Sequence, residues 1–89
     1  MKVEFTHEFV KIYKKRFSNK PNVKLRFEEK LRLFVVNEND PILKNHALGK
    51  KMLGKHAFSV TGDIRVVYYI HKNIAYFVDI GTHNQVYGK

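Results

Sequence analysis

The 89-residue sequence lacks cysteine, has few acidic residues and contains no long apolar segment. Without cysteine the chain can form neither a disulfide nor a thiolate metal site, which fits a reducing cytoplasm. No apolar run approaches the roughly 18 residues that cross a bilayer, and the first residues lack the apolar core of a signal peptide. We therefore expect a soluble, cytoplasmic protein that has no membrane partner.

The shortage of acids leaves a large excess of positive charge. Seventeen Lys and Arg residues stand against eight Asp and Glu, so the formal net charge is +9. Such an excess is typical of proteins that bind a polyanion, with nucleic acid as the first candidate, although a solvated basic surface is the plain alternative. The charge is densest between residues 44 and 56, a segment without acids that carries Lys44, His46, Lys50, Lys51, Lys55 and His56. We expect this segment to contact phosphate groups.

The first half of the chain predicts one strand and two helices. Polar and apolar residues alternate over residues 2–5, which predicts a short strand. Thr6 is a suitable N-cap for a helix over residues 7–17, where apolar side chains recur at helical spacing. After a turn-forming cluster at residues 18–22, helical spacing resumes at Val23 and predicts a second helix to about residue 37.

The second half predicts an antiparallel sheet. Residues 42–55 have an irregular pattern, and the β-branched and aromatic residues that follow predict strands over 56–61, 64–71 and 74–80. The short turns between them favour hairpins, and a further short strand around Val86 is an option. Because 44% of residues are hydrophobic, one core can form. We expect a single α+β two-layer domain over residues 1–89, in which β-α-α is followed by a meander of three to four strands, with both helices on one face.

The residue types suit RNA cleavage by the RNA's own 2′-hydroxyl. This reaction needs a base to remove the hydroxyl proton, an acid to protonate the departing 5′-oxygen, and cations to stabilise the phosphate. Histidine suits both proton transfers near neutral pH, and Arg pairs with two phosphate oxygens. The five histidines show no close ligand spacing, so we expect no metal and no cofactor.

Three residues near the predicted strands are candidates for this chemistry. His83 follows the last predicted strand, where it can face a cleft or be a surface histidine without a role. Alternation places Asp63 and Arg65 on the same face of the central strand, opposite its apolar residues. Either these two side chains pair with each other, or Arg65 contacts phosphate while Asp63 tunes a neighbouring histidine.

Tyr87 lies close to the end of the sequence, in a tail that is ordered only if it docks. Its ring could stack on an RNA base, as aromatic side chains do in RNA recognition. It could equally anchor the tail to the core. The residue pattern leaves both roles open.

Four motifs follow one another in a distinctive order: Asp40-Pro41, Asn45-His46-Ala47-Leu48, Phe58-Ser59-Val60 with Asp63-Ile64-Arg65-Val66-Val67-Tyr68, and Gly81-Thr82-His83. In this order, in size and in charge, the chain resembles the RelE/ParE superfamily of bacterial toxins, in particular its YafQ-like branch. Toxins of that branch are ribosome-dependent mRNA endonucleases, which cut the codon in the ribosomal A site and are held inactive by an acidic antitoxin. The resemblance implies the same activity and the same partners here.

The resemblance also implies roles for individual residues. His83 matches the histidine of the family's Gly-Thr-His motif, which acts as the general acid, and His46 matches the histidine of an Asp-His-Pro-Leu-like segment. Asp63 matches the acidic residue before the central strand, and Arg65 matches a phosphate-contacting arginine. Ser59 stands where YafQ-like toxins carry a further histidine. The general base therefore stays open, with the replacements His56 and Lys55.

Two other functions remain as alternatives. A ParE-like toxin has the same fold but poisons DNA gyrase, and it does not need the set of histidines and arginine found here. A binding module could use the basic surface only to dock an acidic partner. Cleavage of RNA distinguishes the ribonuclease from the gyrase poison and from the binding module.

Overall fold

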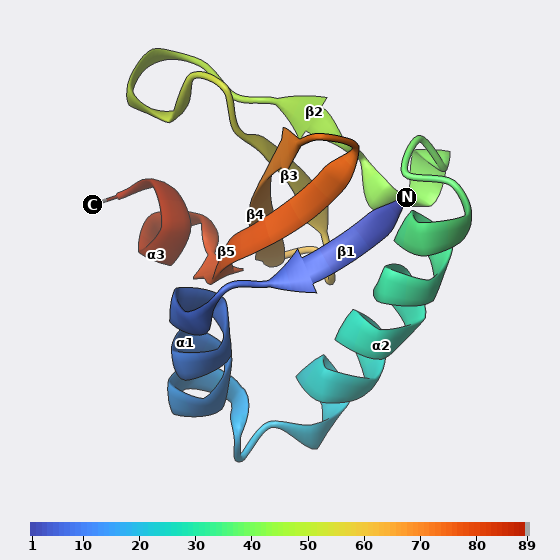
Figure 1. Ribbon diagram of the computed structural model, residues 1–89. Coiled ribbons are helices and arrows are strands. Elements are labelled where there is room, and N and C mark those ends of the chain that lie inside the picture. The colour runs from blue at the N-terminus through green and yellow to red at the C-terminus, as the bar shows by residue number, and fades with distance from the viewer. Residues whose placement is uncertain (89) are drawn as a thin grey trace.

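A computed structural model of the chain describes residues 1–88. It contains a mixed sheet of five strands with two long helices on one side and a short third helix near the C-terminus (Figure 1). The elements are, in chain order, β1 (Lys2–Phe5), α1 (His7–Phe17), α2 (Pro21–Val36), β2 (His46–Ala47), β3 (His56–Ser59), β4 (Ile64–His71), β5 (Ile74–Thr82) and α3 (His83–Tyr87). Single 3₁₀ turns at Pro41–Leu43 and Lys50–Met52 interrupt the segment before β3.

Local signals explain where the long helices begin. The Thr6 hydroxyl accepts a hydrogen bond from the Phe9 backbone N–H at 3.2 Å, which satisfies one of the free donors in the first turn of α1. α2 begins at Pro21, whose fixed φ and missing N–H suit the first helical position. Both predicted helices are confirmed, and the second starts slightly earlier than its apolar pattern indicated.

The sheet has the strand order β1-β5-β4-β3-β2. β3, β4 and β5 form the predicted antiparallel meander, and β1 pairs with β5 in parallel. In β4 the alternation is as predicted: Ile64, Val66 and Tyr68 belong to the core, whereas Val67 lines a cavity on the opposite face. That opposite face carries the candidate functional residues.

Two predictions about the chain's secondary structure are wrong. The residues around Val86 form α3 and not a strand, because Thr82 and Gln85 build a capping box with hydrogen bonds of 3.2 and 2.8 Å. The additional strand is instead β2, inside the segment expected to be irregular. It forms because His46 pairs with Ala57 in β3, a partner that is not local in sequence.

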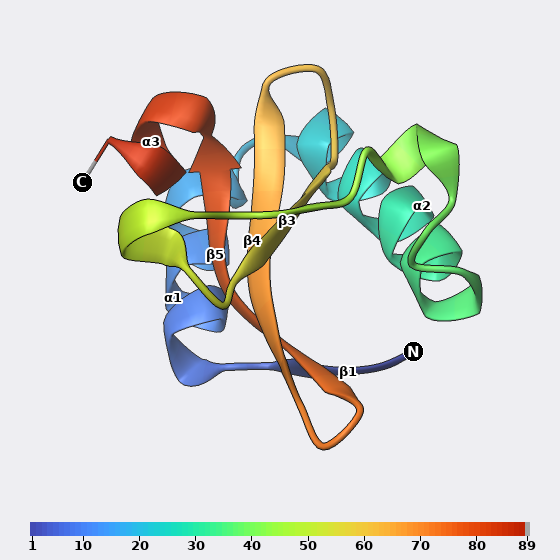
Figure 2. The same cartoon turned by 90° about the horizontal axis from the view of Figure 1, so that it is seen from above.

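The core lies between the two long helices and one face of the sheet. Phe34 of α2 is fully buried, with its ring centroid 4.9 Å from that of Phe58 and 5.0 Å from that of Tyr68. Phe9 of α1 makes an edge contact with Phe77 at 5.5 Å. On the other side of the sheet, α3 and the loop over residues 48–55 lie beside each other (Figures 1 and 2).

Candidate active site

α3 presents His83 and Tyr87 on one side of the helix. The Thr82 capping box starts the helix at His83, directly after β5 and without a connecting loop. His83 and Tyr87 are four residues apart, so their side chains are neighbours, and their rings meet edge to face with centroids 4.6 Å apart. The side chain of His83 is exposed. Its position is set by the end of β5, by the Thr82 cap and by the contact with the Tyr87 ring.

A groove of about 500 Å³ separates α3 from the loop that follows β2. We call it the histidine groove; it is lined by His46, Leu48, Gly49, Lys50, Lys51, Met52, His83 and Tyr87. The structure thus brings together two of the three candidate histidines and two of the four candidate lysines, together with Tyr87. The sheet brings these residues together, because β2 and the end of β5 are far apart in the sequence but lead to side chains on the same face.

His46 has one ring nitrogen engaged. Its Nδ1 lies 3.0 Å from the backbone oxygen of Lys44. Because a carbonyl oxygen only accepts, a hydrogen bond here requires the proton on Nδ1, which leaves Nε2 unprotonated in the neutral ring. The contact therefore holds His46 in the tautomer suited to accept a proton at Nε2.

Tyr87 lies between the histidine groove and a smaller cavity of about 210 Å³ that is lined in part by Lys51, Lys55 and Val67. Its hydroxyl is buried and has no hydrogen-bond partner among residues 1–88. Burial raises the pKa of Tyr87, and the positive charge of Arg65 offsets part of that rise. Arg65 therefore acts electrostatically on a residue that lines the groove.

Arg65 occupies the middle of the sheet between two small residues. It is paired with Ser59 in β3 and with Gly81 in β5. A larger residue at Gly81 would crowd its surroundings: a Cβ atom there would lie 2.6 Å from Arg16 Nη1 and 2.9 Å from Gln85 Cβ, which is close to the backbone and cannot move freely. The glycine of the Gly-Thr-His motif thus lets α1 and α3 both approach the strand that leads to His83.

Five candidate residues do not line the histidine groove: Lys44, Lys55, His56, Asp63 and Arg65. Asp63 is exposed in the turn before β4 and lines a different surface pocket, together with Thr82 and Gln85. Within residues 1–88 it forms no ion pair with Arg65, so the pairing that the sequence left open is not found. The ring of His56 stacks on Tyr68 at 5.3 Å and does not line the groove.

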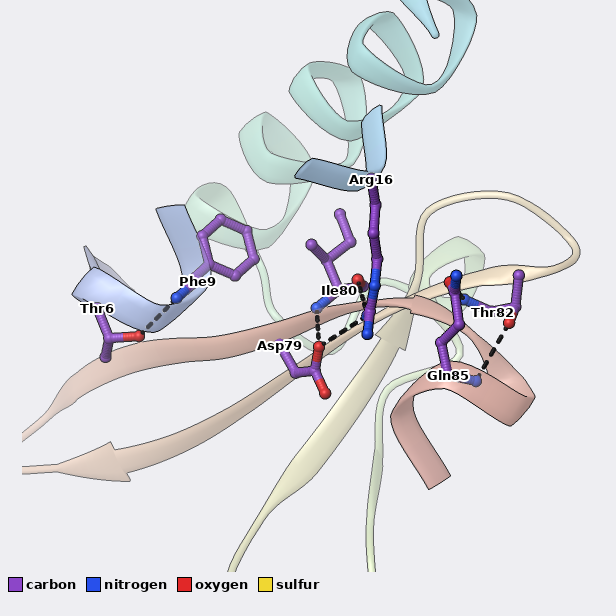
Figure 3. Close-up of polar contacts among 7 residues, drawn as sticks. All are labelled: Thr6, Phe9, Arg16, Asp79, Ile80, Thr82 and Gln85. Carbon is purple, nitrogen blue, oxygen red and sulfur yellow. Dashed lines mark hydrogen bonds and ion pairs between the residues drawn. The ribbon is translucent and has the colours of Figure 1, made fainter. Parts of the chain in front are cut away.

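Sequence reasoning missed the pair formed by Arg16 and Asp79. Asp79 is 6% exposed and lines the smaller cavity beside Tyr87. Arg16 Nη1 reaches it from α1 at 3.1 Å and also donates to the backbone oxygen of Ile80 at 2.8 Å (Figure 3). A lone acid within an otherwise apolar strand was the available signal, because a buried carboxylate needs a partner.

The groove offers imidazole and ammonium groups and is also lined by Tyr87. In the described part of the chain, no group of three or more His, Cys, Asp or Glu side chains is placed to hold a metal ion.

None of the helices within residues 1–88 has both the length and the apolar character needed to cross a membrane.

The fold matches solved toxin structures over nearly their whole length. YafQ from E. coli strain BL21(DE3) superposes with a TM-score of 0.75 at 19% identity, covering 97% of each chain. A YoeB/ParE toxin from Agrobacterium tumefaciens gives 0.77 at 16% identity, covering 93% of this chain and 99% of that one. The E. coli DinJ-YafQ complex gives 0.66 at 24% identity, covering 97% of each chain. No protein of curated function matches the chain.

Sequence-family comparison agrees with the fold. The model of the YafQ family, described as a bacterial toxin of type II toxin-antitoxin systems, matches residues 1–88. The expected resemblance to the RelE/ParE superfamily and the expected α+β fold are both confirmed. The chain therefore belongs to the YafQ family of bacterial toxins of type II toxin-antitoxin systems.

Proposed function

We propose that this toxin is a ribosome-dependent endoribonuclease that cuts mRNA at the codon in the ribosomal A site, with the RNA 2′-hydroxyl as nucleophile. The observation that carries the proposal is the histidine groove, which two histidines, two lysines and Tyr87 line together. This is the set of groups that the reaction needs: a base, an acid and cations for the phosphate.

His46 is the general base in this proposal. Its Nδ1 is held by the Lys44 backbone oxygen at 3.0 Å, so Nε2 takes the proton from the 2′-hydroxyl. The 2′-oxygen then bonds to phosphorus as the bond from phosphorus to the 5′-oxygen breaks. His83 protonates that departing oxygen, and Lys50 and Lys51, which line the groove, stabilise the negative charge on the phosphate.

The other bases considered from the sequence are less well placed. The His56 ring stacks on Tyr68 outside the groove, and Lys55 lines the smaller cavity beside Tyr87. We propose that Lys55 contributes positive charge to RNA binding, as Lys44 does. Asp63 lies outside the groove, so we propose no proton transfer for it; its backbone N–H donates to the Thr61 hydroxyl at 3.1 Å in the hairpin that precedes Arg65.

The proposed partner in the cytoplasm is an acidic antitoxin. YafQ of E. coli is solved in a complex with DinJ, and this chain shares its fold. A net charge of +9 favours an acidic, partly disordered segment that covers the groove and excludes RNA.

Primer extension on mRNA in a reconstituted translation reaction tests the activity. The parent chain should cut at A-site codons only when ribosomes are present, and His83→Ala should lose at least about a hundredfold in rate, the usual contribution of a general acid. The matched control is His7→Ala, because His7 is exposed in the first turn of α1 and lines none of the cavities described.

A message with a 2′-deoxynucleotide at the cleavage position tests the nucleophile. It should bind but stay intact, because it lacks the attacking hydroxyl. Cleavage of that message would exclude the proposed mechanism. Uncut mRNA in a reaction that translates normally, combined with breakage of DNA in cells, would instead favour a gyrase poison.

A further inference from the structure

A second basic pocket lies next to the histidine groove. We call it the arginine pocket; it has a volume of about 210 Å³ and is lined by Lys30, Ile42, Lys44, Ser59, Val60, Thr61, Gly62 and Arg65. We propose that it binds a backbone phosphate of the RNA, next to the phosphate that is cut. The proposal deepens the ribonuclease function and rests on it for the identity of the ligand.

Three cations from separate parts of the fold meet in this pocket. Lys30 comes from α2, Lys44 follows the 3₁₀ turn at Pro41–Leu43, and Arg65 lies in β4. The Lys30 ammonium donates to the Val60 backbone oxygen at 3.2 Å, which holds it at the rim of the β3–β4 hairpin. Two of its N–H bonds remain for a ligand, because an ammonium group has three donors.

The lining residues supply positive charge and no negative charge. No Asp or Glu lines the pocket, and none of its three cations takes part in the ion pairs found within residues 1–88. Like charges brought together repel one another, and a bound anion removes that repulsion. The pocket is therefore suited to an anionic ligand.

Thr61 adds a neutral donor to the same rim. Its hydroxyl oxygen accepts hydrogen bonds from the backbone N–H groups of Asp63 at 3.1 Å and of Ile64 at 3.0 Å. Both acceptor positions are thereby used, so the hydroxyl proton is available to donate. The two terminal oxygens of a backbone phosphate carry enough lone pairs to accept hydrogen bonds from these cations and the hydroxyl, and RNA as the ligand follows from the proposed function.

The arginine pocket and the histidine groove have different lining residues, but two residues of the pocket interact with residues of the groove. Lys44 lines the pocket, and its backbone oxygen holds the ring of His46, which lines the groove. Arg65 lines the pocket, and its charge acts on Tyr87 in the groove. A single RNA strand that is cut in the groove can therefore place a neighbouring phosphate in the pocket.

The test measures binding of a labelled single-stranded RNA to the full chain carrying His83→Ala, which prevents cleavage, over a range of salt concentrations. In this background, Lys30→Gln should weaken binding about fivefold at ~0.1 M salt and lower the slope of log Kd against log salt by about 0.7, the value for one phosphate contact. Lys44→Asn should do the same, and it suits the backbone there, because Lys44 has a φ of 51° and Asn tolerates this region.

The matched control is Lys24→Gln, which removes the same charge from the same helix but lines neither the pocket nor the groove. Its salt slope should equal that of the parent. Lys30→Arg should restore binding, which separates a charge effect from an effect on folding. The proposal is overturned if Lys30→Gln matches Lys24→Gln, if the parent binds no RNA, or if an oligoglutamate of equal charge binds with the same dependence on Lys30.

The outcomes separate this site from the nuclease activity. If the natural chain cuts mRNA but RNA binding does not depend on Lys30, the second phosphate site fails and the proposed function stands. If the natural chain cuts nothing but RNA binding depends on Lys30 and Lys44 as expected, the phosphate site stands and the ribonuclease proposal fails.

Discussion

Arg16 and Asp79 form an ion pair at 3.1 Å that joins the last turn of α1 to β5, with side chains only 22% and 8% exposed (Figure 3). Arg16 also donates to the backbone oxygen of Ile80, one step further along the strand. β5 continues directly into α3. The pair thus anchors the strand end from which His83 projects.

Loss of this anchor should lower stability. We expect Asp79→Ala to reduce the free energy of unfolding by about 2 to 3 kcal/mol, below the full cost for a completely buried pair because Arg16 keeps some contact with water. The control is Glu29→Ala, which breaks the exposed pair with Arg26 and should cost less than about 0.5 kcal/mol. Urea denaturation measures both, and equal losses would contradict the anchoring role.

Tyr68 should make the protein sensitive to alkali. Burial is the main cause that raises its pKa, the charge of Glu38 adds to the rise, and the hydrogen bond to Asn45 lowers the value in part. A raised pKa in the folded state means that stability is complete below the unfolded value of about 10 and is lost as pH increases through the folded pKa.

Tyr68→Phe should therefore have two effects. It removes the hydrogen bond to Asn45 Oδ1, which is 2.7 Å long, at a cost of about 1 kcal/mol at neutral pH. It should also make the decline in stability above pH ~10 shallower, because one group with a raised pKa is gone. Denaturation at several pH values tests this, with Tyr69→Phe as the more exposed neighbour; the same alkaline decline in both variants would refute the assignment.

Substitutions of Tyr87 can separate the contribution of its ring from that of its hydroxyl. The hydroxyl is buried and has no partner in the described part of the chain, so Tyr87→Phe should leave the free energy of unfolding unchanged or raise it by up to about 1 kcal/mol. If the ring stacks on RNA, Tyr87→Phe should retain cleavage, whereas Tyr87→Leu should lose about tenfold, in line with the usual contribution of base stacking. Primer extension compares the two, and a Phe variant as weak as the Leu variant would assign the function to the hydroxyl.

Local sequence signals were sufficient for most of the secondary structure. Thr6 and the spacing of Phe9 and Phe17 indicated α1, and the β-branched run from Ile64 to Ile70 indicated β4, because helices and strands place side chains at fixed periods. The α3 helix was missed, although Thr82 and Gln85 have the spacing of a capping box, which was the available signal. The RelE/ParE resemblance, carried by the order of motifs, predicted the family.

Other relationships were decided by the tertiary structure. His46 and His83 line one groove only because β2 pairs with β3 and the register of the sheet brings the end of β5 onto the same face. Arg16 meets Asp79, and Lys30 reaches the β3–β4 hairpin, across long stretches of sequence. The sequence by itself determined most of the elements, the charge and the candidate residues, because these depend on near neighbours. The fold decided which of those residues share a site, because contacts between distant segments depend on strand pairing and on how the helices pack against the sheet.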